Sequence, residues 1–314
     1  MKKPKISLVV CTYNSPELIE RCIRSILNQN IKDSYEILLV DGGSNKKTLD
    51  MLKKFEAENS NIRLIRNPQK LPEGHGKGKW LAFRKSSGEI FGIIDQDNEL
   101  KGKDCLSNII KPFENKNIFG VACRLYLKKE DSLTNQVISL IGTDPFVAYR
   151  SLDFLINTDK LKLKDEGDYE ILKLERDNLT VTGGNCFFYR RTSLEKIGGY
   201  VQDIDNLVKL LDKGENLIAI PKDAFTYHSA TKGFFDFLKK KKKWGKTFSP
   251  NKRNFSWIPS TRLERKEFIL NLFFILMIFP MVIENYLKVI KTGKLQWLFV
   301  PLLKFSTFLA YVGG

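Results

Sequence analysis

The sequence lacks the features of several protein classes. Its five cysteines form no C-x-x-C pair and no even-numbered framework, so we expect reduced thiols in a protein that faces the cytosol. No signal peptide is expected, because Met1 to Lys5 runs directly into an apolar, strand-like segment. No G-x-G-x-x-G follows the first strand and no Walker loop occurs. The glycine-rich, basic run from Gly74 to Lys79 is suited to contacting phosphates, but it follows a loop.

Size and charge narrow the alternatives further. The 314 residues suit one α/β domain of about 230 residues with an appendage, and 42% apolar residues favour a globular chain. The net charge of +16 is uneven: twelve Lys or Arg stand against two acids between Lys232 and Lys266. A basic block beside an apolar tail is more typical of an anionic membrane surface than of a DNA groove. We therefore expect a membrane partner and no nucleic acid.

The first hundred residues alternate strands and helices. Short apolar runs rich in β-branched residues predict buried strands, and such alternation favours a mainly parallel sheet covered on both faces. Ser15 is expected to cap the first helix, with Pro16 in its first turn. A second, polar helix is expected from Lys46 to Glu58. The expected strands are Ile6 to Cys11, Ile37 to Val40, Ile62 to Ile65 and Ile90 to Ile94.

Polar residues follow three of these strands, and ligands of open α/β sheets bind outside the carboxyl ends of the strands. The exits are Thr12-Tyr13-Asn14, Asp41 and Asp95-Gln96-Asp97. A D-x-D carboxylate pair suits Mg²⁺ or Mn²⁺, which take oxygen ligands and phosphate oxygens together. Alone, the pair could be a solvated turn or a helix cap, and Asp41 could merely begin a Gly-Gly turn. Their coincidence at three strand ends favours a nucleotide and metal site.

The later half supplies further candidates. Gly183-Gly184-Asn185 precedes a strand-like CFFY segment, so the backbone either approaches a ligand there or makes an ordinary turn. Asp203 and Asp205, at a predicted helix start, are both suited to act as a general base; charge stabilising the helix is the alternative. His228 is one of two histidines, and for an isolated histidine a hydrogen-bonded structural role would be favoured.

Six motifs in order resemble family 2 glycosyltransferases of the GT-A fold over about residues 5–245. They are VVCTYN (9–14), LVDGGS (39–44), IIDQDN (93–98), TGGNCFFYRR (182–191), GGY with QDID (198–205) and YH (227–228). The resemblance implies a mixed, mainly parallel sheet with flanking helices. It also implies inversion at the anomeric carbon by one in-line displacement of a nucleoside diphosphate.

The resemblance also implies roles residue by residue. Thr12, Tyr13, Asn14, Asp41, Lys79, Asp95 and Gln96 would bind the nucleotide-sugar donor, and Gly42 replaces the second acid of the family's D-D-G-S. Gly184 and Asn185 would line the sugar and acceptor side. Asp203 would be the base, although Gln202 replaces the usual Glu, and Asp205 stays open as an alternative. Asp97 and His228 would hold Mn²⁺ or Mg²⁺.

The sequence thus predicts three parts: a catalytic domain at 1–231, a basic juxtamembrane segment at 232–266 and membrane-associated helices at 267–314. The apolar runs at 268–283 and 295–312 are marginal as spans, and helices lying in the interface fit equally well. We expect a membrane-associated enzyme whose catalytic domain faces the cytoplasm. It would use a nucleotide sugar, UDP before GDP, and a lipid-linked or surface-glycan acceptor. The alternatives are a nucleotidyltransferase and a non-catalytic basic protein that binds anionic lipid or nucleic acid.

Overall fold

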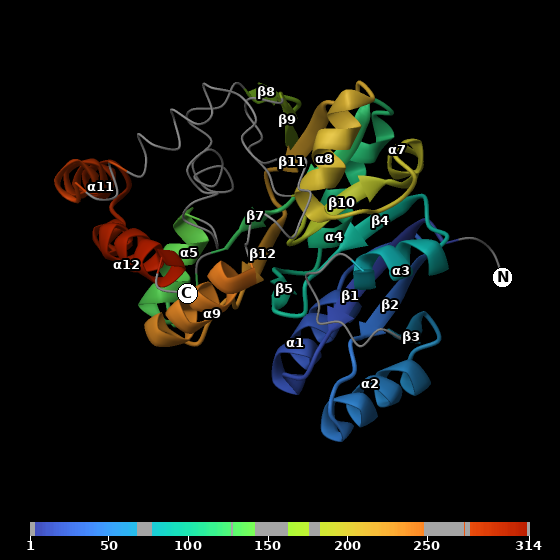
Figure 1. Ribbon diagram of the computed structural model, residues 1–314. Coiled ribbons are helices and arrows are strands. Elements are labelled where there is room, and N and C mark those ends of the chain that lie inside the picture. The colour runs from blue at the N-terminus through green and yellow to red at the C-terminus, as the bar shows by residue number, and fades with distance from the viewer. Residues whose placement is uncertain are drawn as a thin grey trace. The chain divides into compact units, whose positions relative to one another are not determined.

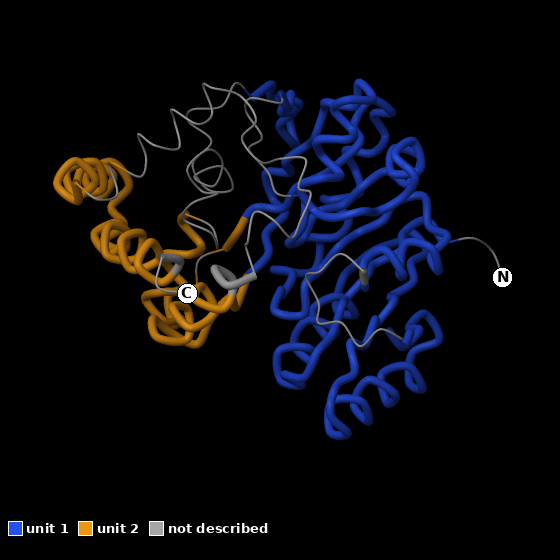
Figure 2. The backbone as a smooth tube through the Cα atoms, viewed as in Figure 1, with its two compact units in different colours: residues 1–124, 161–227 blue, residues 125–160, 228–314 orange. Residues whose placement is uncertain are grey.

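The computed structural model describes residues 4–67, 77–126, 128–141, 163–175, 183–247, 273 and 277–312. The glycine-rich loop at 74–76, the basic stretch at 248–266 and half of the apolar run at 268–283 lie outside these residues. The chain divides into two compact units (Figure 2). The first comprises 1–124 with 161–227, and the second comprises 125–160 with 228–314. The domain boundary expected at residue 232 stays a prediction.

The first unit is built on a mixed sheet with the strand order β3-β2-β1-β4-β10-β6-β11-β9-β8 (Figure 1). The pairs β3-β2, β2-β1, β1-β4 and β6-β11 are parallel, whereas β10 runs antiparallel to both β4 and β6. A smaller sheet has the order β5-β12-β7. The bounds are β1 (Ile6–Thr12), β2 (Tyr35–Asp41), β3 (Ile62–Arg66), β4 (Ile90–Ile93), β5 (Asn98–Leu100), β6 (Ile118–Ala122), β7 (Arg124–Leu125), β8 (Leu163–Asp165), β9 (Tyr169–Lys173), β10 (Phe187–Arg190), β11 (Leu217–Pro221) and β12 (Phe225–His228).

The predicted fold class is confirmed: a large mixed sheet is flanked by helices, and further helices follow toward the C-terminus. All seven residues of β1 are buried, as expected for a strand covered on both faces. The first four predicted strands are present, with ends shifted by at most two residues. Helices of this unit are α1 (Pro16–Leu27), α2 (Lys46–Glu58), α3 (Lys77–Lys85), α4 (Cys105–Ile110), the 3₁₀ turn η1 (Lys111–Glu114), α7 (Arg191–Lys196) and α8 (Asp203–Asp212).

The start of α1 departs from the expectation. Ser15 precedes Pro16 as predicted, but it adopts a left-handed conformation (φ 59°) and makes no side-chain capping bond. The cause lies in the neighbouring residue. Asn14 is also left-handed (φ 52°), and its side chain accepts a hydrogen bond from the backbone N–H of Asn45 at 3.0 Å. This long-range contact fixes the turn, and the local capping preference of Ser15 is overridden. Asn45 instead caps α2 by accepting from Thr48 N at 3.0 Å.

Two hydrophobic layers cover the sheet. On one face, alternate residues of β1 pack with the buried apolar side of α1, including Ile19 and Ile23. On the other, the rings of Phe83 in α3 and Phe91 in β4 meet edge to face at 5.3 Å. Tyr200 continues this second layer, 6.0 Å from Phe91. The aromatic contacts therefore connect α3, β4 and the segment before α8.

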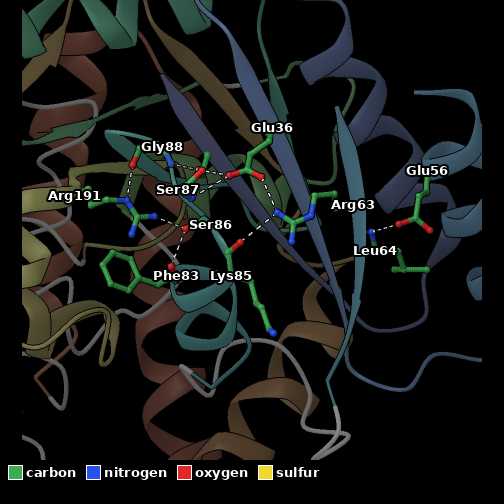
Figure 3. A network of polar contacts seen from close by, with 11 residues as sticks. Glu36, Glu56, Arg63, Leu64, Phe83, Lys85, Ser86, Ser87, Gly88 and Arg191 are labelled. Atoms are coloured by element: carbon green, nitrogen blue, oxygen red, sulfur yellow. Dashed lines mark hydrogen bonds and ion pairs between the residues drawn. The ribbon is translucent and has the colours of Figure 1, made fainter. Parts of the chain in front are cut away.

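A polar network closes the turn between α3 and β4 (Figure 3). Gly88 N donates to Ser7 Oγ at 2.8 Å, and Ser7 Oγ donates to Glu36 at 2.7 Å. Glu36 also pairs with Arg63 at 3.1 Å. Arg191 donates to the carbonyl oxygen of Gly88 and to the hydroxyl of Ser86, while its guanidinium lies 4.5 Å from the centre of the Phe83 ring. Residues of β1, β2, β3 and α7 thus fix the start of β4 and the end of α3.

The second unit is helical. An apolar cluster joins its helices and includes Phe237, Trp297 and Leu303, each at most 3% exposed. Asn135 Oδ1 accepts from Thr231 N at 3.0 Å, and Gln296 donates to Gln136 at 2.7 Å. No helix within the described residues is both long and apolar enough to cross a membrane. The elements are α5 (Leu133–Ile141), α9 (Phe234–Thr247), α11 (Phe279–Thr292), the 3₁₀ turn η4 (Leu295–Phe299) and α12 (Val300–Val312).

Candidate active site

The exits of β1, β2 and β4 meet at one edge of the sheet. β1 pairs with both β2 and β4 in parallel, so the three carboxyl ends point the same way. Tyr13 N donates to Gln96 Oε1 at 2.9 Å, and Asn14 N donates to Ser44 Oγ at 2.9 Å. Thr12 is buried, and its carbonyl oxygen accepts from Gly42 N at 2.8 Å. The three polar strand exits therefore form one cross-linked edge, as their positions in the sequence indicated.

Asp41 is buried at this edge and organises a turn. Its carboxylate accepts from Gly43 N at 3.0 Å and from Ser44 N at 3.1 Å, and Gly43 takes the left-handed conformation (φ 94°) that glycine favours. The Gly-Gly turn considered from the sequence is therefore present. Tyr13 lies beside this turn with 41% of its surface exposed. An exposed ring next to backbone N–H groups suits the stacking of a flat base.

The Asp95-Gln96-Asp97 triplet lies between β4 and β5 and is held by a residue that the sequence did not single out. Asn98 is fully buried. Its Oδ1 accepts from Asp95 N at 2.9 Å, and its Nδ2 donates to Asn185 Oδ1 at 2.8 Å. Asn98 thus connects the carboxylate triplet to the loop before β10. The only signal in the sequence was its place at the end of the IIDQDN motif.

Lys79 is the centre of the charged part of the site. Its side chain is 3% exposed, and its ammonium lies 3.1 Å from Asp95 Oδ1 and 3.2 Å from Asp203 Oδ1. Burial alone lowers the pKa of Lys79, but the carboxylates of Asp203 and Asp95 outweigh burial and hold this pKa well above its ordinary value. Burial raises the pKa of Asp95, against the pull of Lys79. The raised pKa of Lys79 favours a charged ammonium, whereas the raised pKa of Asp95 favours a neutral acid. We take the ion pair as charged, because Lys79 faces two carboxylates at close range.

Asp203, the first residue of α8, is fixed from three sides. Besides Lys79, the hydroxyl of Tyr200 donates to its Oδ1. On the third side the backbone of Gly184 approaches the carboxylate closely, since a Cβ added at Gly184 would lie 2.3 Å from Asp203 Oδ2. The side chain keeps 32% of its surface exposed, whereas the residue Asp205 is 6% exposed. The arrangement gives Asp203 a defined direction together with access to solvent. Neither Tyr200 nor the contact between Lys79 and Asp203 could be read from local sequence.

The remaining predicted residues are placed as follows. Asn185 has a left-handed backbone (φ 52°) and contacts Asn98, so it belongs to the same edge. His228 ends β12 at 7% exposure and belongs to the second unit, so its sharing a metal with Asp97 stays a prediction. In the part of the chain that is described, no three His, Cys, Asp or Glu side chains gather into a metal cluster. A divalent ion held by one or two carboxylates and substrate phosphates needs no such cluster, and the D-x-D carboxylates fit that mode.

Comparisons with known proteins agree with this geometry. The sequence model described as "Glycosyl transferase family 2" matches residues 7–198. The GalNAc(5)-diNAcBac-PP-undecaprenol beta-1,3-glucosyltransferase of Campylobacter jejuni is 29% identical over 133 residues, covering 42% of this chain and 42% of the relative. A dolichyl N-acetyl-alpha-D-glucosaminyl phosphate 3-beta-D-2,3-diacetamido-2,3-dideoxy-beta-D-glucuronosyltransferase of Methanococcus voltae is 24% identical, covering 74% of this chain and 76% of the relative. The chain spans only 30–42% of the length of four curated relatives that it matches.

Solved structures are similar over nearly the whole chain. The mannosyltransferase PcManGT from Pyrobaculum calidifontis, in complex with GDP-Man and Mn²⁺, aligns with a TM-score of 0.59 at 15% identity, covering 99% of this chain and 88% of that one. Residues 1–349 of S. aureus TarS, in complex with UDP-GlcNAc, align with a TM-score of 0.50 at 14% identity, covering 98% and 91%. At such low identity these likenesses establish the fold alone, which is GT-A.

The fold and the family match define the class of protein: a glycosyltransferase with the GT-A fold. The chain belongs to glycosyl transferase family 2. The resemblance that the six motifs indicated is therefore confirmed. The family match does not support the two alternatives, a nucleotidyltransferase and a non-catalytic basic protein.

Proposed function

We propose that the protein is an inverting, metal-dependent glycosyltransferase that moves a sugar from a nucleoside-diphosphate sugar to a lipid-linked or cell-surface glycan acceptor. One observation carries the proposal: Asp203 is held by Lys79 at the edge where the exits of β1, β2 and β4 meet. A single displacement at a sugar carbon requires a general base close to the bound nucleotide sugar, where it can accept the proton of the incoming hydroxyl. UDP is the first nucleotide to test, and the GDP-Man complex of the Pyrobaculum enzyme makes GDP the necessary comparison.

The proposed reaction follows from the placement of these groups. Asp203 accepts the proton of the acceptor hydroxyl as the oxygen forms its bond to the anomeric carbon. The bond from that carbon to the diphosphate oxygen breaks on the opposite face, and its electron pair leaves with the nucleoside diphosphate. Attack on one face and departure from the other invert the carbon. Lys79 and Tyr200 hold the carboxylate of Asp203 in its direction throughout.

Mn²⁺ or Mg²⁺, bound by Asp97 with His228 as the proposed second ligand, would supply charge neutralisation for the leaving diphosphate. Asp95 would face the ribose, and Thr12, Tyr13, Asn14, Asp41 and Gln96 would surround the nucleotide. Gly184 and Asn185 would line the sugar and acceptor side. The acceptor class rests on the two relatives above, whose names specify undecaprenol and dolichyl carriers.

The site is tested by transfer and by binding measured separately. A thermal-shift screen of nucleotide sugars with Mn²⁺ identifies the donor. Asp203→Asn should then keep donor binding but lower turnover by about 10²–10⁴-fold, since general-base catalysis contributes that much. Asp212→Asn, an exposed acid at the other end of α8, is the matched control. Asp205→Asn separates the two candidate bases: a loss confined to Asp205→Asn would overturn the assignment of Asp203.

The metal role has its own test. Asp97→Ala should abolish metal-dependent hydrolysis of the nucleotide sugar and weaken binding of the nucleoside diphosphate in the presence of Mn²⁺. Nucleotide binding without metal should change little, because Asp97 would contact the nucleotide through the ion. Unchanged hydrolysis and unchanged binding in Asp97→Ala would refute the metal assignment.

We also propose that the protein works at a membrane, with the catalytic domain on the cytoplasmic side. The support is the basic character of residues 232–266 and the lipid carriers named for the two relatives. Binding of the intact chain to anionic vesicles tests the association, and protease protection in cells tests the side.

A further inference from the structure

Helix α11 exposes its apolar face. Six of its large side chains lie at spacings of three or four residues along one side of the helix, which is the pattern of a single apolar stripe. In a globular protein such a stripe normally faces the core. Here each member is between 45% and 78% exposed. The stripe consists of Phe279, Val282, Ile283, Tyr286, Leu287 and Ile290.

The opposite side of α11 is the one that packs against its own unit. Met281 and Asn285 are buried there, and Asn285 Nδ2 donates to the carbonyl oxygen of Met281 at 2.7 Å. The ammonium of Lys288 lies 4.6 Å from the centre of the ring of Trp297, which belongs to the apolar cluster of the second unit. The helix therefore packs against the apolar cluster through one side. The exposed stripe lies on the other side, so it is not the side that contacts this cluster.

Further exposed apolar side chains follow α11 along the chain. Leu295 and Leu298 of η4 and Leu302 of α12 are 69%, 52% and 49% exposed. Exposed large apolar side chains in this number are typical of a site of interaction with another molecule or with a membrane. Isolated exposed side chains would need no such explanation, but the regular spacing in α11 does.

The charges around the stripe select the partner. From Phe279 to Val312 the one acid, Glu284, pairs with Lys288 at 3.2 Å, which leaves Lys291, Lys294 and Lys304 as the excess of positive charge. Lysines beside an apolar helix face favour an anionic lipid surface, where their ammonium groups meet the headgroups while the apolar side chains enter the acyl boundary. A second copy of the chain fits less well, because a two-fold interface would bring the same excess of positive charge together from both sides.

We infer that α11 lies in the plane of an anionic bilayer surface and docks the protein there through the stripe from Phe279 to Ile290. The inference rests on the proposed membrane association but not on the proposed chemistry. Lys291 and Lys294, which follow the stripe, interact with the headgroups.

The test compares two double variants of the full chain. Ile283→Gln/Ile290→Gln places amides in the centre of the stripe without changing charge. Leu133→Gln/Val201→Gln makes the same type of change at two exposed apolar side chains outside the stripe, 47% and 39% exposed. Binding is measured by sedimentation with vesicles of phosphatidylcholine and phosphatidylglycerol, and with vesicles of phosphatidylcholine alone. Melting temperatures verify that both variants fold.

We expect the stripe variant to lose about tenfold or more of the vesicle affinity, since two buried aliphatic side chains contribute at least that much. The control variant should bind as the unmodified chain does. Binding should weaken on vesicles of phosphatidylcholine alone and at high salt, because the lysines then lose their partners or are screened.

Three outcomes would overturn the inference. If the stripe variant binds vesicles as the unmodified chain does, another element makes the contact, and the proposed membrane association still stands. If the unmodified chain binds no vesicle, the membrane association fails as well. If the chain self-associates in sedimentation equilibrium and the stripe variant alone dissociates, the stripe is an interface between copies. Donor binding and transfer to a soluble acceptor, measured on the same proteins, report on the proposed chemistry independently.

Discussion

The ammonium of Lys79 lies 3.2 Å from a carboxylate oxygen of Asp203, although 124 residues separate them in the chain. Lys79 comes from α3, between β3 and β4, and Asp203 begins α8. The same ammonium contacts Asp95 at 3.1 Å. One buried cation therefore connects the proposed nucleotide side of the site to the proposed base, and the spacing of the two carboxylates depends on it.

Replacing the buried cation of Lys79 should lower the stability of the fold. Lys79→Met leaves two carboxylates facing each other in a largely buried position, and breaking a buried ion pair from one side costs about 3 kcal/mol. We expect the free energy of unfolding to fall by about that amount, measured by urea denaturation. Lys79→Arg keeps the charge and should lose less.

The double variant Lys79→Met/Asp203→Asn removes one charge of each sign and should regain part of the loss. Lys53→Met, at an exposed position of α2, is the control for the loss of a lysine. Equal unfolding free energies for Lys79→Met and Lys53→Met would show that the buried pair contributes nothing.

Gly184→Ala should lower activity without unfolding the protein. The added Cβ would lie 2.3 Å from Asp203 Oδ2, which is the end of a side chain and can move. Displacing the proposed base by about 1 Å should reduce kcat/KM by about 10²-fold. Gly233→Ala is the matched control, because a Cβ there meets nothing within 4 Å. If Gly184→Ala lowers the melting temperature so far that unfolded protein accounts for the lost activity, displacement of Asp203 is not the cause.

Asn98→Ala should disturb the position of the Asp95-Gln96-Asp97 triplet by removing the side chain that holds it. It removes the acceptor for Asp95 N and the donor to Asn185, and it leaves a partly buried backbone N–H without its partner. The expected cost is about 2 kcal/mol of unfolding free energy, together with weaker donor binding. Asn98→Asp keeps the acceptor, but it places a carboxylate at a fully buried position beside Asp95 and Asp97, with one oxygen facing Asn185 Oδ1, so it should cost more stability than Asn98→Ala. The reverse order in a denaturation series would contradict the assigned bonds.

Gly88→Ala tests the network of Figure 3. The new Cβ would lie 2.5 Å from Ser7 N and 2.7 Å from Ile6 C, both backbone atoms that cannot turn aside. We expect about 2 kcal/mol of destabilisation from overpacking. Nucleotide affinity per folded molecule should remain near normal, since Gly88 lies at the opposite end of β4 from Asp95. A change in affinity without a change in stability would contradict a purely structural role.

The sequence predicted the parts of the fold that depend on local pattern. Apolar runs such as Ile6 to Cys11 identify buried strands because a parallel sheet covered on both faces tolerates few polar residues. Since the carboxyl ends of parallel strands share an edge, the meeting of Thr12, Asp41 and Asp95 could also be predicted. Helix α2 has the expected bounds, and in the structure the side chain of Asn45 caps its first turn.

The rest depends on contacts that no local pattern encodes. Ser15 fails as a cap because Asn14 is held by Asn45, thirty-one residues away. Asn98 contacts Asn185 across 87 residues, and Lys79 meets Asp203 across 124. These partners become visible only when β10 and α8 are placed against the first half of the sheet. The sequence could therefore name Asp203 as a candidate base but could not say what orients it.

The place of β10 in the sheet has a consequence for synthesis of the chain. Strands β1 to β4 come from residues 6–93 and can pair as soon as they leave the ribosome, but the partner on the other side of β4 is made only at residues 187–190. For that interval β4 is an open edge, which can pair with another nascent chain. We expect a fragment that stops before β10 to aggregate, and the exposure of the β4 edge to end when residue 190 has emerged.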